Sequence, residues 1–418
     1  MNLFFRRAAA FFLVSAASLL IVEFALRFFN PPALQYYRDV KLLHAYHPDY
    51  GVSLQPNESR FVRHYSGAWE GRFTTNSLGQ RGKKEPDPDV SKLLCLGDSM
   101  VMGFGVSDED TFCSQLDGLE LSGEKYQTLN IGVDAYGSLG AAKRLEDMTN
   151  QLTKVKEVLF FISPNDFTMP EVLRNQGILP DDETDALHEN DLVWKRNFHI
   201  QFEATRISFF LQALKLGYEQ TKVQITISQA SARTEIQSLF TNPLRYIKES
   251  FSRTPKKPIC NLTKSETENQ ICPEPSLASE FPCTDKPSSP ESLPPLPDVT
   301  IAAYERMIAL SKTKNFKLTP VFLPMQMEEI FCYAKGKYSP LGNYSIQAEF
   351  FWEKKKIDTI KLIPYVKKMC GAPFQTKTGK IRKAGIKDYF IPGDGHLTKI
   401  GNRWVSDALK QELRKGIR

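Results

Sequence analysis

Short apolar runs alternate with amphipathic segments over most of the chain. Five runs are too short for helices and predict buried strands: Leu93–Leu96, Thr128–Ile131, Val158–Ile162, Val321–Leu323 and Tyr389–Ile391. Four segments with apolar residues at helical spacing predict helices: Thr111–Leu119, Ser138–Leu152, Val299–Thr313 and Thr398–Leu413. Strands that alternate with helices are typical of a parallel sheet with helices on both faces. The pattern therefore predicts an α/β fold.

The alternation is interrupted between the third and fourth predicted strands, at about residues 167–299. The first half of this insertion contains a strongly apolar helical segment, Phe202–Leu216, that we expect to pack over the sheet. Residues 251–300 hold ten of the chain's 26 prolines and three cysteines. Because proline cannot continue a helix or a central strand, we predict an extended loop there, with a disulfide as a candidate staple.

The N-terminus predicts a signal anchor that spans a membrane. Two arginines precede an uncharged stretch, Ala8–Val22, and apolar residues continue to Phe29. If Glu23 pairs with Arg27, four residues later, a helix over this segment is about 33 Å long and can cross a bilayer. A cleaved signal peptide is the alternative, because the uncharged core has the length of a signal h-region. No convincing A-x-A cleavage site follows it.

The charge distribution also predicts an orientation and a domain organisation. Positive charges stay on the inner side of a membrane, so the chain after Asn30 is expected outside the cytoplasm, in the periplasm or the extracellular space. We therefore divide the sequence into a signal anchor at residues 1–30, a connecting segment at 31–90 and a main domain at 91–418.

Composition excludes several classes of protein. With 41% hydrophobic and 24% charged residues, the chain can bury a core and is not disordered as a whole. The formal net charge of +6, without a block of five like charges, argues against a nucleic-acid-binding protein. The cysteines lack zinc-site spacing, since Cys260, Cys272 and Cys283 lie far apart. We expect no metal, no cofactor and no nucleic-acid partner.

The seven cysteines suggest disulfides in an oxidising compartment. Cys95 lies in a predicted strand and is expected to be a buried thiol. We predict at least one disulfide among the five later cysteines, with the pairing left open. These are Cys260, Cys272, Cys283, Cys332 and Cys370.

The candidate chemistry begins at Ser99. Gly97-Asp98-Ser99 follows the first predicted strand directly, at the sheet edge where open α/β folds bind ligands. The plain alternative is a Gly-Asp-Ser turn without a function. A phosphate-binding loop is excluded, because the surrounding residues match neither G-x-x-x-x-G-K-[ST] nor G-x-G-x-x-G.

Two further strand ends carry candidate hydrogen-bond donors. Gly132 follows the second predicted strand and Asn165 follows the third. The backbone N–H groups of Ser99 and Gly132 and the side-chain amide of Asn165 can point at one position, which predicts an oxyanion hole. Taken singly, each residue also fits an ordinary turn or strand end.

Asp394-Gly395-His396 precedes the last predicted helix and supplies a candidate base. A serine nucleophile needs a general base with a pKa near neutrality, and a carboxylate can fix the tautomer of a histidine in that role. Of the six histidines, His396 alone lies at a predicted sheet edge beside an acid. A structural histidine is the alternative.

Together, the segments that carry Ser99, Gly132, Asn165 and His396 resemble the four sequence blocks of the SGNH (GDSL) hydrolases. The stretch FTTNSLGQRG at residues 73–82 is also similar to one in membrane-anchored bacterial relatives. The resemblance runs from about Leu93 to Leu413, apart from the insertion. It implies a flavodoxin-like three-layer α/β/α fold with a central parallel sheet. It further implies Ser99 as nucleophile, His396 as base, Asp394 as its orienting acid, and an oxyanion hole of Ser99, Gly132 and Asn165.

Two positions depart from the family pattern. The third block usually reads G-x-N-D, whereas Ser163 stands here in place of the glycine. The last block usually spaces its acid and base as D-x-x-H, and that acid position is Gly393. Asp394 must therefore act from two residues away, or the enzyme works as a Ser–His dyad.

The resemblance implies ester chemistry but leaves the substrate open. We expect a serine esterase acting on acyl esters, O-acetyl or short acyl, of an extracytoplasmic glycan or lipid. An O-acyltransferase of the same fold, acting on a cell-envelope glycan, is the first alternative. A non-catalytic envelope-binding protein is the second.

Overall fold

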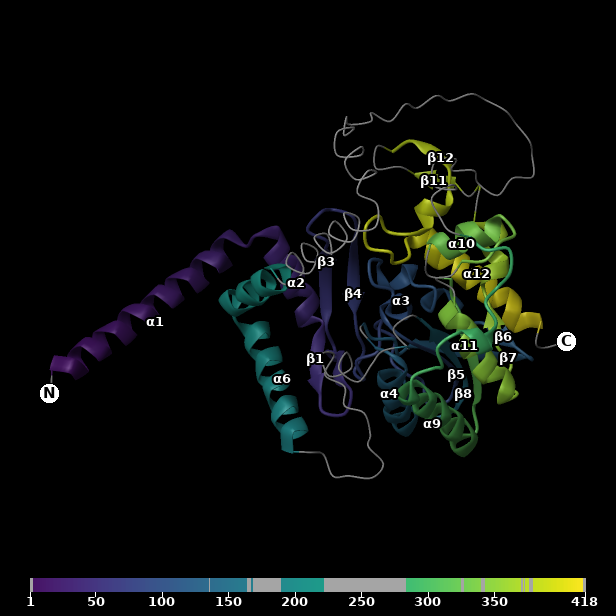
Figure 1. The fold of residues 1–418 in the computed structure, drawn as a ribbon, viewed down its shortest axis with the longest axis horizontal. Coiled ribbons are helices and arrows are strands. Elements are labelled where there is room, and N and C mark those ends of the chain that lie inside the picture. Colours follow the sequence, from purple (N-terminus) through teal and green to yellow (C-terminus); the bar gives the residue numbers. More distant parts are fainter. Residues whose placement is uncertain are drawn as a thin grey trace, which may run out of the picture. The chain divides into compact units, whose positions relative to one another are not determined.

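The computed structural model describes residues 3–134, 136–163, 167, 189–221, 283–324, 327–339, 343–369, 371, 373–375 and 379–415. The chain forms two compact units. The first comprises Met1–Leu34 and Glu203–Gln270, and the second comprises Gln35–Phe202 and Ile271–Arg418. Figure 1 shows the elements of both units.

In the first unit, helix α1 (Leu3–Phe29) contains the predicted apolar segment. It is long and apolar enough to cross a membrane, which fits an anchor or a signal sequence. Glu23 accepts a hydrogen bond from Arg27 Nε at 2.7 Å, so the pairing that their spacing allows is present. Glu23 also accepts hydrogen bonds from the backbone N–H groups of Phe209 and Phe210, at 3.0 and 2.8 Å, where a helix over residues 209–221 begins. The carboxylate of this apolar helix therefore has partners within its own unit.

The second unit is built on a six-stranded sheet. Its order is β10–β9–β8–β5–β7–β6, and all neighbours are parallel except β6 and β7. Counted along the chain, the five parallel strands follow the flavodoxin-like order 2-1-3-4-5, whose switch point lies between β5 and β8. The strands are β5 (Ser91–Leu96), β6 (Glu120–Leu121), β7 (Glu124–Asn130), β8 (Val155–Ile162), β9 (Lys317–Phe322) and β10 (Ile360–Lys361).

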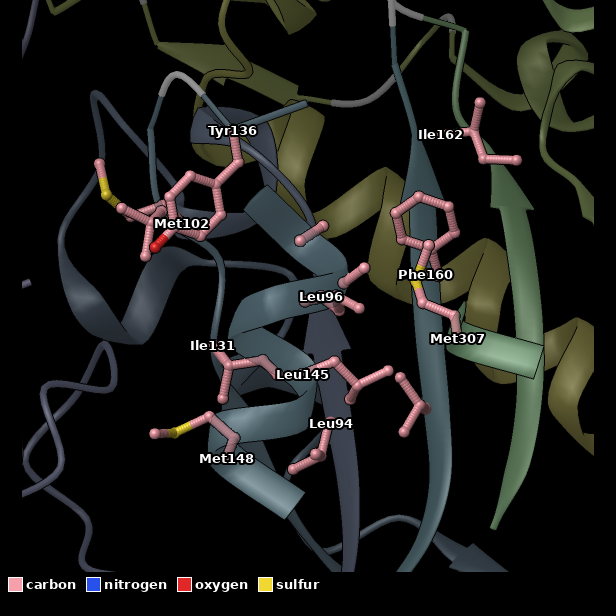
Figure 2. Close-up of a cluster of buried hydrophobic side chains, with 14 of the residues drawn as sticks. Leu94, Leu96, Met102, Ile131, Tyr136, Leu145, Met148, Phe160, Ile162 and Met307 are labelled. Atoms are coloured by element: carbon pink, nitrogen blue, oxygen red, sulfur yellow. The ribbon is translucent and has the colours of Figure 1, made fainter. Parts of the chain in front are cut away.

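Helices cover both faces of this sheet. Because side chains alternate along a strand, Leu94 and Leu96 of β5 face one buried core while Leu93 and Cys95 face the other. Figure 2 shows Leu145 of one covering helix packed near Leu94 and Leu96. The predicted α/β fold is therefore confirmed. The first core includes residues of α4 (Ser138–Gln151), α9 (Asp298–Lys314) and α11 (Asn343–Lys354), and the second includes residues of α10 (Met327–Ala334) and α12 (Lys399–Lys415).

Residues 35–81, interpreted from the sequence as part of a connecting segment, pack onto the first core. Helix α2 (Pro32–Leu42) precedes two antiparallel hairpins. The hairpins are β1 (His44–His47) with β2 (Gly51–Leu54), and β3 (Ser59–Arg63) with β4 (Glu70–Thr74). The segment contributes these buried side chains: Tyr36, Leu43, Tyr50, Leu54, Val62, Trp69 and Phe73.

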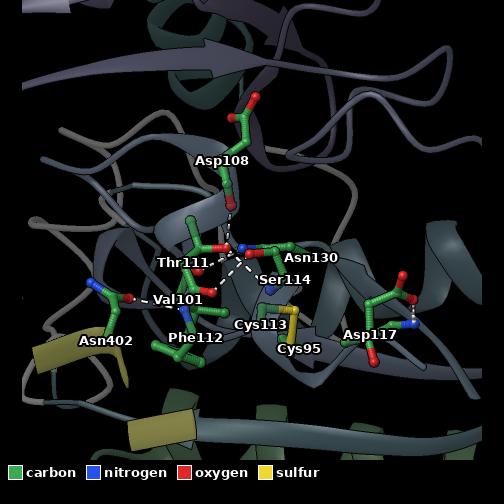
Figure 3. Close-up of a disulfide and its surroundings, with 12 residues drawn as sticks. Cys95, Val101, Asp108, Thr111, Phe112, Cys113, Ser114, Asp117, Asn130 and Asn402 are labelled. Carbon is green, nitrogen blue, oxygen red and sulfur yellow. Dashed lines mark hydrogen bonds between the residues drawn. A yellow bond between two sulfur atoms is a disulfide. The ribbon is translucent and has the colours of Figure 1, made fainter. Parts of the chain in front are cut away.

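The helix predicted over Thr111–Leu119 is wrong. The region contains only two short 3-10 turns, η1 (Asp108–Asp110) and η2 (Ser114–Leu116). The hydroxyl groups of Thr111 and Ser114 donate to nearby backbone carbonyls at 3.0 and 2.9 Å, and such bonds compete with a helix. Cys95, predicted as a free thiol, instead forms a disulfide with Cys113 that ties this region to β5 (Figure 3).

The strand predicted at Tyr389–Ile391 is also wrong. Its place is taken by the 3-10 turn η7 (Ile386–Tyr389) and a single bridge between Phe390 and Leu397. The backbone N–H of Ile391 donates to the carbonyl of His396 at 2.7 Å. The chain therefore folds back on itself here, where the prediction extended the sheet.

Only parts of the insertion are described. Within it, α6 (Glu189–Ile207) ends before Ser208, so the predicted helix over Phe202–Leu216 is interrupted there. In the proline-rich part, Cys283 forms a disulfide with Cys332, which confirms the prediction of at least one disulfide among the five later cysteines. Cys260, Cys272 and Cys370 lie outside the described residues. The short remaining elements of the second unit are α3 (Ser99–Met102), η4 (Pro290–Ser292), η6 (Ile363–Lys368), β11 (Pro373–Gln375) and β12 (Ile381–Lys383).

Candidate active site

Ser99 lies at the carboxyl end of β5, beside the switch point of the sheet. It is the first residue of the short helix α3, and Asp98 caps this helix by accepting a hydrogen bond from Met100 N at 2.9 Å. The Ser99 side chain is partly exposed, whereas Asp98 is buried. Because the first N–H groups of a helix have no acceptor within it, the Ser99 N–H is available to an oxygen atom outside the helix.

A tight loop after η7 carries Asp394 and His396. Gly395, between them, has φ of +87°, a left-handed conformation that favours glycine. The N–H groups of Asp394 and Gly395 both donate to the carbonyl of Ile391, at 3.2 and 3.1 Å. This turn brings the carboxylate of Asp394 onto the ring of His396, two residues later.

Ser99, His396 and Asp394 form a continuous chain of hydrogen bonds. His396 Nε2 lies 2.8 Å from Ser99 Oγ, and His396 Nδ1 contacts Asp394 Oδ1. A carboxylate accepts hydrogen bonds, so the proton of a neutral ring belongs on Nδ1 and leaves Nε2 as an acceptor for the serine hydroxyl. The sequence left open whether Asp394 contacts His396, and the structure brings the two into contact.

Trp69 completes the surroundings of Asp394. Its indole Nε1–H donates to Asp394 Oδ2 at 3.3 Å. Burial raises the pKa of Asp394, but hydrogen bonds from His396 and Trp69 outweigh this effect and hold the pKa below its usual value. Asp394 is therefore ionised at neutral pH. Sequence reasoning missed Trp69, because the two partners are 325 residues apart and no local pattern links them.

The predicted oxyanion-hole residues are only partly described. The Gly132 N–H donates to Asn130 Oδ1 at 3.0 Å, so it must exchange this acceptor before it can bind an oxyanion. Gly132 also has a packing role, since a Cβ there would lie 2.7 Å from Met102 N of α3. Asn165 lies outside the described residues. Donation of hydrogen bonds to an oxyanion by Gly132 and Asn165 stays a prediction from the sequence.

Arg81 supports the segment that follows α3. Its buried guanidinium donates to Asp108 Oδ1 at 2.5 Å and to the carbonyl of Val106 at 2.8 Å, and it packs over the ring of Phe73. Arg81 belongs to the 73–82 stretch that the sequence singled out. This stretch therefore fixes the backbone next to the Ser99 helix.

Among the described residues, no group of three or more His, Cys, Asp and Glu side chains is arranged to hold a metal ion.

No protein-family model matches the chain, and no curated protein matches it. Among solved structures, the chain is similar to the crystal structure of a putative acylhydrolase from Bacteroides fragilis. The similarity covers 80% of this chain and 92% of that chain, with 12% sequence identity and a TM-score of 0.32. At these values the likeness is too distant to indicate an activity.

Proposed function

We propose that this chain is a serine ester hydrolase with Ser99 as nucleophile, His396 as general base and Asp394 as the acid that orients the histidine. The distance of 2.8 Å between Ser99 Oγ and His396 Nε2, with Asp394 on the other ring nitrogen, carries this proposal. A nucleophile, a base and an orienting group within hydrogen-bond reach are the signature of an activated serine.

In the proposed reaction, Ser99 Oγ attacks the carbonyl carbon of an ester while its proton moves to His396 Nε2. The tetrahedral intermediate collapses when the C–O bond to the leaving alcohol breaks, and that oxygen takes the proton from Nε2. Water then attacks the carbonyl carbon of the Ser99 acyl-enzyme and gives a proton to His396 Nε2. The bond between that carbon and Ser99 Oγ breaks, Oγ takes the proton back from Nε2, and the acid is released.

The ionised Asp394 stabilises the imidazolium that forms in each half-reaction. Its low pKa keeps it in the accepting form at neutral pH. The Ser99 N–H is the first candidate donor to the developing oxyanion, with Gly132 and Asn165 proposed from the sequence as the others. Each such donor contributes about 3 kcal/mol to stabilisation of the transition state in other serine hydrolases.

We further propose that the substrate is an acyl ester of a glycan or lipid outside the cytoplasm. An apolar N-terminal helix that can cross a membrane and two disulfides in the second unit support this compartment, because disulfides persist in oxidising surroundings. The membrane is then a partner of the chain through α1.

Product analysis with the purified full chain tests the function. An aryl acetate and an acetylated glycan are supplied with and without a glycan acceptor, and free acetate and acetylated acceptor are quantified. The proposal predicts free acetate in both cases and none with Ser99→Ala. Acetate found mainly on the acceptor would identify a transferase instead, and turnover unchanged by Ser99→Ala would contradict the serine mechanism.

A further inference from the structure

The second unit contains another histidine–carboxylate pair, His44 with Asp134. His44 is 4% exposed, its Nε2 contacts Asp134 Oδ1, and its Nδ1 lies 2.7 Å from the carbonyl oxygen of Val40. A carboxylate and a carbonyl oxygen both only accept hydrogen bonds, and a neutral imidazole has a single N–H to donate. Hydrogen bonds to both acceptors therefore require a proton on each ring nitrogen. The geometry therefore makes this pair an imidazolium and a carboxylate. Burial alone lowers the pKa of His44, but the charge of Asp134 raises it above the usual value.

Backbone hydrogen bonds bring Asp134 to the strand end that carries Ser99. Beyond the end of β7, the N–H of Val133 donates to the carbonyl of Gly97 at 3.2 Å. Asp134 follows Val133 directly, and Ser99 follows Gly97 by two residues. The carboxyl ends of β5 and β7 therefore present Ser99 and Asp134 at neighbouring positions on one edge of the sheet.

Asp134 interacts electrostatically with His396, the histidine that contacts Ser99. Burial raises the pKa of Asp134, but His44, a backbone hydrogen bond and His396 together lower it, so that the net pKa lies below the usual value. Burial raises the pKa of the Tyr36 hydroxyl, and the charges of Asp394 and Asp134 add to this effect. Asp134 therefore belongs to the surroundings of the Ser99 site.

Aromatic rings extend from Asp394 to the surface. The ring of Trp69, which donates to Asp394, contacts Tyr36 with ring centroids 5.8 Å apart. Tyr36 in turn contacts Tyr65 at 5.7 Å, and Tyr65 is 50% exposed. Aromatic faces pack against the C–H faces of sugar rings, and carboxylates accept hydrogen bonds from sugar hydroxyls. Aromatic rings and a carboxylate therefore occur together around Asp394.

We propose that Asp134, held by His44, binds a hydroxyl group of a carbohydrate ester next to the ester bond that Ser99 attacks. The inference rests on the proposed function and deepens it by naming the substrate class. The Asp134 side chain is 28% exposed and that of His44 is 5% exposed, so a buried cation lies behind a partly open carboxylate. A carboxylate oriented in advance binds a hydroxyl without a further ordering cost, and such sites discriminate against ligands that lack the hydroxyl.

The test compares kcat and KM of the full chain on two esters that differ in hydroxyl groups, 4-nitrophenyl acetate and an acetylated monosaccharide. Asp134→Asn is expected to lower kcat/KM for the sugar ester about 10- to 100-fold more than for the aryl ester, mainly through KM. His44→Gln should act in the same direction. Asp134→Glu, which keeps the carboxylate, should recover part of the preference.

Asp147→Asn is the matched control. Asp147 also accepts a hydrogen bond from a ring side chain of the N-terminal segment, Tyr50 Oη at 2.8 Å, but it lies on α4, and its other partners are Arg144 and Gln151 of the same helix. This variant should leave the ratio of the two kcat/KM values unchanged.

Three outcomes overturn the inference. The first is a parallel loss on both esters in Asp134→Asn, which would indicate a structural role. The second is an unchanged ratio, and the third is no turnover of the sugar ester by the wild-type chain. Failure of the proposed function is recognised separately, because the wild-type chain would then not hydrolyse the aryl ester, or Ser99→Ala would retain that activity.

Discussion

Two histidine–carboxylate pairs in the described part of the second unit, His396–Asp394 and His44–Asp134, have the same chemical groups and different environments. In both, one ring nitrogen contacts an aspartate, at His396–Asp394 and at His44–Asp134. The other nitrogen of His396 lies 2.8 Å from the hydroxyl of Ser99, whereas that of His44 lies 2.7 Å from a backbone carbonyl. A hydroxyl can give up a proton to the ring, and a carbonyl oxygen can only accept a hydrogen bond.

This difference decides what each histidine can do. The ring of His396 can take a proton from Ser99 and return it, because Nε2 is unprotonated when the ring is neutral. The ring of His44 is held as a cation by two acceptors, so its contribution is a fixed positive charge that orients Asp134. The group that contacts the second ring nitrogen, more than the His–Asp contact itself, therefore distinguishes a histidine that acts as a base from one that is held as a fixed cation.

The largest expected effect separates the two histidines directly. His396→Ala removes the base, so we expect kcat/KM on an aryl ester to fall by at least about 10⁴-fold. His44→Gln leaves the Ser99–His396–Asp394 chain intact and should cost at most about tenfold on this ester. Steady-state kinetics of folded variants measures both values. Equal losses would remove the distinction between the pairs.

The next effect concerns Asp394. Asp394→Asn keeps the shape of the side chain but favours the wrong histidine tautomer, which costs about 10⁴-fold in other serine hydrolases. We expect a loss of about 10³- to 10⁴-fold in kcat, measured on the same aryl ester. A loss below about tenfold would instead identify a Ser–His dyad.

Trp69→Phe is the matched variant for this measurement. It removes only the indole donor to Asp394 Oδ2 and leaves the contact of Asp394 with His396. One neutral donor to a charged acceptor contributes about 1.5 to 3 kcal/mol when fully formed, and this bond is long at 3.3 Å. The loss in kcat should therefore stay below about tenfold.

Much of the fold could be predicted from the sequence because buried parallel strands are short apolar runs. The runs at β5, β7, β8 and β9 all became strands. Two predictions failed where hydrogen bonds or a disulfide decide the backbone conformation, because apolar periodicity does not report these interactions. At Thr111–Leu119, side-chain hydroxyls and a disulfide replace the helix, and at Tyr389–Ile391 the chain turns back within the loop that carries His396.

The site itself was predictable only where local motifs carry it. Ser99 and His396 lie in short patterns at predicted sheet edges, but the contact of Asp394 depends on the left-handed turn at Gly395. Trp69 and His44 meet their carboxylates across 325 and 90 residues. Such partners come together through tertiary packing, for which a single sequence holds no local signal.

The smallest expected effect concerns stability at the His44 pair. The pKa of His44 is raised, so its stabilisation is complete below about pH 6.5 and is lost as pH rises through its pKa in the folded protein. The pKa of Asp134 is lowered, so its stabilisation is present above about pH 3.9 and is lost as pH falls through its own folded-state pKa.

His44→Gln should therefore lower the free energy of unfolding by about 1 to 3 kcal/mol near pH 5.5 and by less near pH 9. Urea unfolding of the wild-type chain and the variant at both pH values measures the difference. A destabilisation that is larger at pH 9 would contradict the assignment of His44 as a cation.

Covalent labelling of Ser99 by a fluorophosphonate tests the central claim most directly. The reagent reacts with a serine only when a neighbouring base activates it, so labelling reports the Ser99–His396 contact without knowledge of the substrate. We predict that peptide mapping finds the label on Ser99 in the wild-type chain and in His44→Gln, and that it is lost in Ser99→Ala and His396→Ala. A wild-type chain that stays unlabelled, or a label that persists in Ser99→Ala, would contradict the assignment of Ser99 as an activated nucleophile.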